Sequence, residues 1–424
     1  MAQTLAEKII ARAARKPAVA PGDIVTCAVD LALMHDSGGP RRVKPILERL
    51  GARVWDPTRV IVVTDHFVPV FDSDTAAILD LTRRWVADQD IQGFYDKQGI
   101  CHIVLPERGH LRPGLFVVGG DSHSPTGGAF GCFMFGIGAT DMAGVLVTGE
   151  TWLRVPDTIL IEWDGRLQNG VVAKDMMLRL CGDLGLDGGG YGVVQFAGSA
   201  IESMPMQERM TLCNMTAELG AMTGLIEPDE TTGRYLAEAG ADLDDIMAWR
   251  SDPNARYGAK HSYYAGNLAP QVAAPHSPAN ARDAGCFDKV DVDVAYIGAC
   301  TGAKLTDLRN AARVLKGRKV ASGVRLLVAP ASLRDRETAE EEGTLSILIE
   351  AGASLLASAC GLCAGYGEHR LDADTVCISS TARNFQGRMG APEAKVYLAS
   401  PFTVAASAVA GRIADPRDML QDRP

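Results

Sequence analysis

Short apolar runs rich in β-branched residues recur along this chain, and they end in turns that carry polar or cysteine side chains. The runs alternate with segments of helical period, which favours the α/β class with largely parallel sheets. Ligands in open α/β sheets bind just beyond the carboxyl ends of the strands, so the turns are expected to share one cleft. The five turns are Thr64-Asp65-His66, Gly119-Gly120-Asp121-Ser122-His123, Gly298-Ala299-Cys300, Ala359-Cys360-Gly361-Leu362-Cys363 and Ser380-Thr381-Ala382-Arg383.

A change in composition divides the chain. With 424 residues it is too long for one small core, which predicts two or three domains. The stretch NLAPQVAAPHSPANARDAG has no clear period and is rich in Pro, Ala and Asn. It predicts a linker at about 252–290. We therefore expect an N-terminal α/β region over 1–285 and a C-terminal α/β domain over 286–424.

Charge and hydropathy exclude several classes of partner. The net charge of −10 argues against nucleic acid or an anionic membrane surface, because both require a basic footprint. No segment is typical of a transmembrane helix. Thr4 followed by Glu7 predicts a capping box opening an amphipathic helix with Ile9 and Ile10 on one face. Neither a transit peptide nor a secretory signal has that pattern, so a cytoplasmic protein is expected.

The cysteines are expected to be free, buried or metal-bound rather than paired in disulfides. CGLC at 360–363 is by itself ambiguous between a redox pair, half of a zinc site and coincidence. Cys300 also follows an apolar run, which makes a set of three thiolates plausible, whereas Cys377 lies within such a run and is expected in the core. Three thiolates on a four-iron cluster would leave one iron open as a Lewis acid.

An ordered series of motifs resembles the aconitase superfamily, and above all the large subunits of isopropylmalate dehydratase and homoaconitase. The resemblance covers about residues 5 to 415. It implies three α/β domains around a central cleft, two of them in the N-terminal region, and a hydro-lyase activity on a small hydroxy-di- or tricarboxylate. It also implies a [4Fe-4S] cluster with one iron that no cysteine binds, held by Cys300, Cys360 and Cys363. The motifs are DLALMHD, VVTDHFVP, GICHIVLPERG, GGDSHSPTGGAFG, TLCNMTAELGA, YIGACTG, CGLC and ARNFQGR.

The resemblance also implies roles for individual side chains. Elimination of water from a hydroxy-acid needs a base at carbon, an acid for the leaving hydroxyl and stabilisation of the charge that develops. His66 beside Asp65 would protonate the leaving hydroxyl. The other implied pairs are His102 with Asp121 and His123 with Glu218, with His35 and Ser122 as substrate contacts and Asn214 near the cluster.

Two arginines are expected to bind substrate carboxylates. Arg383 and Arg388 flank the sequence Asn-Phe-Gln-Gly, and the first of them follows an apolar run. The planar guanidinium fork matches a carboxylate bidentately, so two of them suit a di- or tricarboxylate.

Two positions depart from the pattern of the family. The resemblance leads us to expect Asn after Cys300-Thr301 and again before Arg383, but Gly302 and Ala382 stand there. Loss of both amides is expected to open space and to remove hydrogen bonds near the substrate. A divergent hydratase of methylmalate, maleate or citraconate is therefore an alternative.

The resemblance implies a partner as well. Full-length aconitases carry a fourth, swivelling domain that supplies a serine base, and no segment after Gly411 is expected to form one. A separate small subunit would take its place. Other classes stay open: an iron–sulfur redox protein, which usually has a fourth thiolate, an RNA-binding relative, and a zinc hydrolase.

Overall fold

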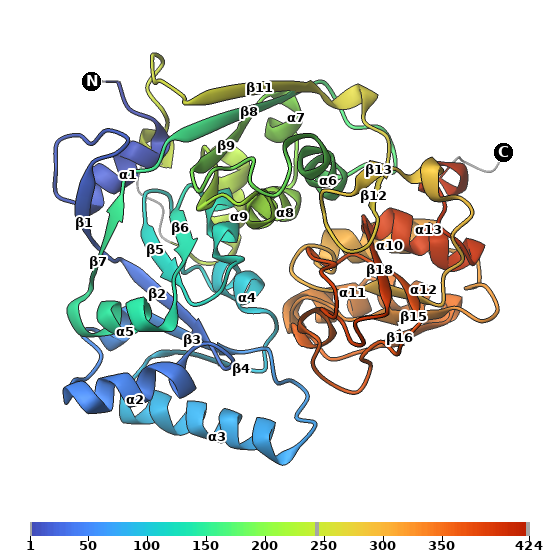
Figure 1. Cartoon of the computed structure of the whole chain (residues 1–424), viewed down its shortest axis with the longest axis horizontal. Helices are drawn as coiled ribbons and strands as arrows, with labels where there is room; N and C mark the ends of the chain where they lie inside the picture. Colours follow the sequence, from blue (N-terminus) through green and yellow to red (C-terminus); the bar gives the residue numbers. More distant parts are fainter. Residues whose placement is uncertain (1, 242–245, 421–424) are drawn as a thin grey trace.

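The computed structural model describes residues 2–241 and 246–420, which form four β-sheets with helices packed against them (Figure 1). The predicted α/β class with largely parallel sheets is confirmed. The predicted capping box is also confirmed: it opens α1 (Leu5–Ala13), which buries both Ile9 and Ile10. Among the described residues, no helix has the length and apolar character needed to cross a bilayer.

A five-stranded parallel sheet lies in the N-terminal region, with the strand order β4-β3-β2-β5-β6. Side chains on both of its faces are buried, which explains why runs such as VIVVT are apolar throughout. Helices α1, α2, α3 and α5 contribute to the core on one face, and α4 contributes to the core on the other. The strands are β2 (Leu31–His35), β3 (Val60–Thr64), β4 (Gly93–Asp96), β5 (Phe116–Gly119) and β6 (Phe133–Gly136), and the helices are α2 (Pro40–Leu50), α3 (Ser73–Asp88), α4 (Cys101–Glu107) and α5 (Ala139–Thr148).

A second parallel sheet follows in the chain, with the order β10-β9-β8-β11, and a two-stranded antiparallel pair of β1 and β7 lies beside the first sheet. The strands are β1 (Ile24–Ala28), β7 (Glu150–Arg154), β8 (Thr158–Asp164), β9 (Val193–Ala197), β10 (Thr223–Ile226) and β11 (Ala259–Tyr264). The helices are α6 (Ala173–Leu184), α7 (Ser199–Glu202), α8 (Met206–Asn214) and α9 (Glu230–Glu238).

The C-terminal sheet has seven strands in the order β13-β12-β18-β17-β14-β15-β16, and the five from β18 to β16 are parallel. Its strands are β12 (Gln271–Ala273), β13 (Ala281–Asp283), β14 (Val294–Ile297), β15 (Arg325–Val328), β16 (Ala353–Leu355), β17 (Val376–Ser379) and β18 (Lys395–Ala399). Its helices are α10 (Leu305–Leu315), α11 (Leu333–Glu341), α12 (Thr344–Ala351) and α13 (Pro401–Ala410).

The expected linker at 252–290 contains strands. It holds β11, which belongs to the second sheet, and β12 and β13, which belong to the C-terminal sheet. The stretch is therefore not the plain linker that was expected. The strands β12 and β13 could not be predicted because three residues are too few to show a period. We propose that the C-terminal domain begins at β12 rather than at residue 286.

One buried apolar cluster joins the N-terminal region to the C-terminal domain. It includes Met177 of α6 together with Ala295 of β14 and Leu308 of α10. The two parts of the chain are therefore packed against each other around a shared core, and the side chains between them are held in place.

Candidate active site

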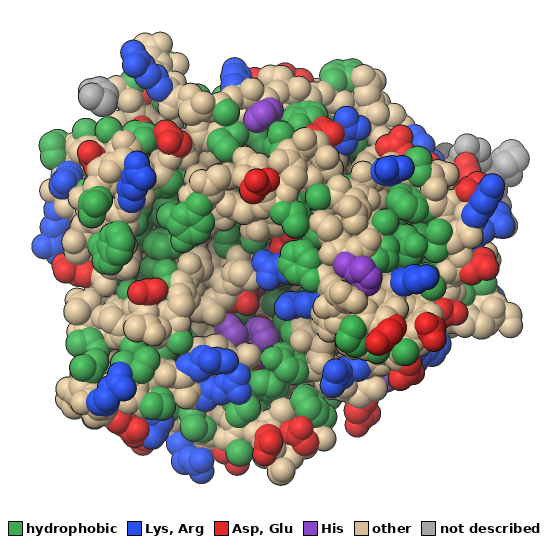
Figure 2. Space-filling view, viewed as in Figure 1, with side chains coloured by type: hydrophobic (Ala, Val, Ile, Leu, Met, Phe, Trp, Pro, Cys, Tyr) green, Lys and Arg blue, Asp and Glu red, His purple; other side chains and the backbone are tan. Residues whose placement is uncertain are grey.

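The ends of β2, β3 and β5 carry the polar turns of the N-terminal region, and these three strands are neighbours in one parallel sheet. Their carboxyl ends therefore lie at the same edge and bring His35, Asp65 and Asp121 together. Figure 2 shows a hollow near the centre of one face of the molecule, with histidine side chains on its floor and basic side chains at its edge. The C-terminal sheet lies across from the N-terminal sheet that carries these turns (Figure 1).

Asp65 and His66 form a buried pair. Nδ1 of His66 lies 2.6 Å from Oδ1 of Asp65, and Oδ2 of Asp65 accepts from the backbone N–H of Cys101 at 2.7 Å. Burial opposes charge on both groups, but their mutual attraction outweighs it, raising the pKa of His66 to about 9 and lowering the pKa of Asp65 to about 2. His66 is therefore a protonated acid at neutral pH.

His35 stacks on His66, with ring centroids 4.1 Å apart. Its Nε2 lies 3.1 Å from the carbonyl oxygen of Gly120. Burial and the neighbouring His66 lower the pKa of His35 to about 4. The stacked pair thus combines a neutral imidazole with a charged one.

Asp36, for which the sequence predicted no role, holds the turn that carries this pair. Its carboxylate is fully buried and accepts backbone N–H groups from Asp65, His66 and Phe67, at 3.3, 3.0 and 3.0 Å. These bonds tie the end of β2 to the turn after β3. Its place directly after His35 in the motif DLALMHD was the available signal.

The two other expected pairs are also brought together. Nε2 of His102 lies 2.7 Å from Oδ1 of Asp121, and Nε2 of His123 lies 3.2 Å from Oε1 of Glu218. Burial alone would raise the pKa of Asp121, but the hydrogen bond and charge of His102 hold it well below its ordinary range. Carboxylates placed in this way fix the orientation of the imidazoles.

The two arginines have different surroundings. Arg383 donates to Oε1 of Glu218 at 2.6 Å and to Oγ of Ser122 at 2.9 Å. Burial opposes charge on Glu218, but Arg383 and His123 together lower its pKa. Arg388 instead donates to the backbone carbonyl oxygen of Cys363 at 2.9 Å. Arg383 therefore belongs with the acid–base groups and Arg388 with the cysteines.

The three expected cysteine ligands lie on the C-terminal side of the site. Cys300 follows β14, and Cys360 and Cys363 lie in the turn after β16. The N–H of Cys360 donates to the carbonyl oxygen of Asp65 at 2.8 Å, and Nδ2 of Asn214 donates to Sγ of Cys300 at 3.1 Å. The cysteines are thereby linked to the acid–base groups, although the two sets come from different sheets.

The donor set fits an iron–sulfur cluster. Cys300 and Cys363 are 6% and 5% exposed, Cys360 is half-buried, and none of the three forms a disulfide. Three buried polar atoms of the expected site residues have no hydrogen-bond partner among the described residues: Nδ1 of His102, Oδ1 of Asn214 and Oε2 of Glu218. Buried polar atoms are normally satisfied, so these atoms are free to contact a bound group.

The expectation that Gly302 opens space near the substrate is wrong. A Cβ added to Gly302 would lie 2.3 Å from both Cβ and Oγ of Ser380. Ser380 is fully buried, and its hydroxyl bonds to backbone atoms of Gly298 and Gly302. The volume that a larger residue at 302 would take is therefore filled by a serine, and Ala382 is buried as well, at 1% exposed.

Two buried lysines support the loops of the site, and the sequence did not single them out. Lys174 of α6 and Lys304 before α10 are 1% and 0% exposed. Nζ of Lys304 donates to the carbonyl oxygen of Cys300 at 3.2 Å and pairs with Asp307 at 2.6 Å. A lysine is usually at the surface, so only the packing reveals these two.

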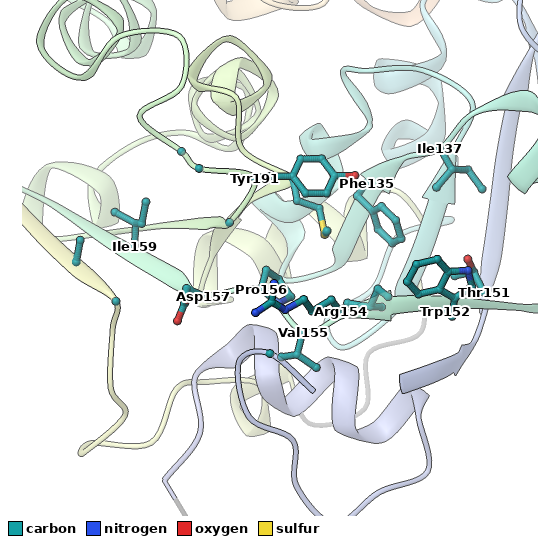
Figure 3. Close-up of a pocket in the computed structure, with 18 of the residues that line it drawn as sticks. Phe135, Ile137, Thr151, Trp152, Arg154, Val155, Pro156, Asp157, Ile159 and Tyr191 are labelled. Carbon is teal, nitrogen blue, oxygen red and sulfur yellow. The ribbon is translucent and has the colours of Figure 1, made fainter. Parts of the chain in front are cut away.

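Another pocket, of about 800 Å³, lies elsewhere. Figure 3 shows it between β7, the start of β8 and the loop before β9, with Trp152, Arg154 and Tyr191 among its lining. None of the predicted site residues lines this pocket.

The chain is similar in sequence to proteins of one family. The sequence model of the Aconitase family (aconitate hydratase) matches residues 7–286 and 282–411. The chain is 44% identical to 3-isopropylmalate dehydratase large subunit 1 of Methanopyrus kandleri, over 99% of this chain and 100% of that protein. It is 42% identical to a probable methanogen homoaconitase large subunit of Methanothermobacter thermautotrophicus, over 97% of each. The crystal structure of Thermococcus kodakaraensis aconitase X gives a TM-score of 0.49 at 12% identity, covering 94% of this chain and 90% of that one.

Proposed function

The chain belongs to the aconitase family of hydro-lyases, and from this premise we propose that it is the large, catalytic subunit of a dehydratase of the 3-isopropylmalate type. The reaction removes a hydroxyl from one carbon and a proton from the next, leaving a carbon–carbon double bond. The substrate class is a small hydroxy-dicarboxylate or hydroxy-tricarboxylate. The two relatives named above support this class, because one is named as a 3-isopropylmalate dehydratase subunit and the other as a probable homoaconitase subunit.

Membership of the family implies a [4Fe-4S] cluster, and we propose that Cys300, Cys360 and Cys363 hold it and leave one iron without a cysteine. When bound, the cluster would supply a Lewis-acidic iron that polarises the leaving hydroxyl. Asn214 would contact it through the amide, whose Nδ2 already donates to Sγ of Cys300.

His66 is the proposed proton donor to the leaving hydroxyl, which departs as water. One observation carries this role: the buried Asp65–His66 pair is hydrogen-bonded through the Asp65 carbonyl oxygen to the N–H of Cys360. An acid with a pKa of about 9 keeps its proton at neutral pH until the substrate needs it.

Arg383 and Ser122 are proposed to bind a substrate carboxylate. Glu218 accepts from the guanidinium of Arg383 and is itself bonded to His123, so it holds Arg383 in place. Arg388 and His35 would complete the pocket, and His102 with Asp121 would stabilise charge that develops on the substrate. The base that takes the proton from carbon is proposed to come from a small subunit that covers the hollow.

The substrate within this class is left to the experiment. Ser380 fills the volume beside Gly302, so the site differs from the family pattern without being larger there. A divergent hydratase of methylmalate, maleate or citraconate is the second candidate. A screen of hydroxy-dicarboxylates should include 3-isopropylmalate and these three compounds.

The test begins with cluster loading without air. We expect iron and acid-labile sulfide in the wild-type protein, and their loss from a Cys360→Ser variant. Cys286→Ser is the matched control, because Cys286 is an exposed free cysteine outside the site. Zinc in place of iron, or equal cluster content in Cys360→Ser and wild type, would refute the assignment.

Turnover is then measured with and without a small subunit of the same family. We expect the loaded chain to dehydrate its substrate at full rate only when the small subunit is present. Full activity of the large chain alone would show that it supplies the base itself. Prolonged exposure to air should abolish turnover, because the iron that lacks a cysteine is held least strongly and is lost first.

A further inference from the structure

The side chain of Lys174, in helix α6, reaches the loops of the C-terminal domain. It lies in the first turn of α6, and its Nζ donates to the carbonyl oxygens of Ser380 and Thr381 and to Oγ1 of Thr301. Thr301 follows Cys300 directly, so this ammonium group holds together a turn that carries a proposed ligand and the turn that precedes Arg383.

The charge of Lys174 has no direct counter-ion. All three acceptors are neutral oxygens, and Nζ forms no salt bridge with any carboxylate in the described part of the chain. Lys304, the other buried lysine, is paired with Asp307. A lone buried ammonium is costly, and burial lowers the pKa of Lys174, but only to about 8, so it stays charged at neutral pH.

We propose that Lys174 is a positioning residue for the iron–sulfur cluster, whose buried positive charge offsets the negative charge of the cluster and its three thiolates. This inference rests on the proposed function. The nearby charges agree with it, since the carboxylate of Glu218, the thiolate of Cys363 and the carboxylate of Asp307 all favour the charged lysine, and only the charge of Lys304 opposes it. A cluster in this position would be the missing counter-ion.

The consequence is a change in the electronic properties of the cluster. Reduction adds negative charge, and a fixed positive charge nearby stabilises the reduced form, so it raises the reduction potential. The same charge holds the Cys300 turn against the Ser380–Thr381 turn, which slows the release of the cluster.

The experiment compares Lys174→Met, Lys174→Gln and Lys174→Arg in the full chain, loaded with iron and sulfide without air. The readouts are the reduction potential, from a mediated titration followed by electron paramagnetic resonance, and the rate of cluster loss in air. We expect both neutral variants to have a lower potential than wild type and to lose the cluster about tenfold faster. Lys174→Arg should resemble wild type in both.

A double variant, Lys304→Met with Asp307→Asn, is the control for structural damage. It removes a buried lysine and its hydrogen bond to Cys300 but leaves the net charge unchanged, so its potential should stay near that of wild type.

A wild-type reduction potential in both neutral variants would overturn the proposal. So would a Lys174→Gln variant that matches wild type in potential and in the rate of cluster loss while Lys174→Met does not. If neither neutral variant folds with a cluster while Lys174→Arg does, the need for charge stands; if Lys174→Arg fails too, shape alone is required and the proposal falls. Absence of a cluster from wild type would refute the proposed function instead.

Discussion

At the scale of single residues, the Asp65–His66 pair decides how the site responds to pH. His66 is an acid whose pKa is raised to about 9, so turnover should fall as the pH rises through that value. In Asp65→Asn the neighbouring negative charge is gone, and this alkaline limb should move to lower pH. His66→Asn should lower kcat by about 10²-fold or more. A pH–rate profile measures both effects.

The control for this prediction is His261→Asn, because His261 lies in β11, outside the site. An unchanged alkaline limb in Asp65→Asn would contradict the role of the pair. The pair also acts on stability with a definite sign. Its contribution is complete between the ordinary pKa values of 3.8 and 6.5, and is lost as the pH falls through about 2 or rises through about 9.

Residues that belong to recognisable motifs could be predicted, and residues that act through burial could not. Asp65, His66 and the cysteines stand at the ends of apolar runs, where the sequence marks them. Lys174 is a different case, because a single lysine in a helix carries no signal of burial. Only the packing of α6 against the C-terminal domain makes its position informative.

At the scale of elements, the turn after β14 is fitted to the turn after β17. Gly302 has no room for a side chain, because Ser380 fills the adjacent space. Gly302→Ala should therefore lower the free energy of unfolding by about 2 kcal/mol, and Gly302→Asn by more. Chemical denaturation of the protein measures this.

A matched control is Gly285→Ala, since a Cβ at Gly285 would meet no atom within 4 Å. Ser380→Gly combined with Gly302→Ala should recover only part of the loss, because the backbone oxygen of Ser380 would still lie 2.5 Å from the new Cβ. Equal stability of Gly302→Ala and wild type would show that the two turns separate easily.

Elements with a strong period could be predicted, and the shortest could not. The capping box of α1 and the long apolar strands follow from local pattern. The strands β12 and β13 have three residues each; they pair with each other, and β12 also pairs with β18, which is far away in the chain. Local pattern cannot show a contact of that kind.

At the scale of the whole molecule, two buried carboxyl groups, Glu107 of the N-terminal region and Asp335 of the C-terminal domain, lie near each other. Glu107 ends α4 and accepts from Oγ of Ser332 at 2.7 Å, and Asp335 lies in the first turn of α11. Burial raises the pKa of both, and the charge of Asp335 raises that of Glu107 further.

When folding raises the pKa of a carboxyl group, the folded protein becomes less stable as the pH rises. The reason is that the folded state holds the proton more tightly than the unfolded state and must give it up. Wild-type protein should thus melt at a lower temperature at about pH 9 than at about pH 6, and Glu107→Gln should reduce that difference. Glu341→Gln, an exposed change on α11, is the control. A melting temperature that depends on pH equally in Glu107→Gln and wild type would contradict this.

The division of the site between sheets has a consequence for biosynthesis. The histidines and carboxylates of the site precede residue 220, whereas all three cysteines proposed as ligands follow residue 299. Synthesis proceeds from the N-terminus, and early regions fold first. The histidines and carboxylates of the site are therefore made before any of the proposed ligand thiols emerges, so the proposed cluster is installed only after that part of the chain has left the ribosome.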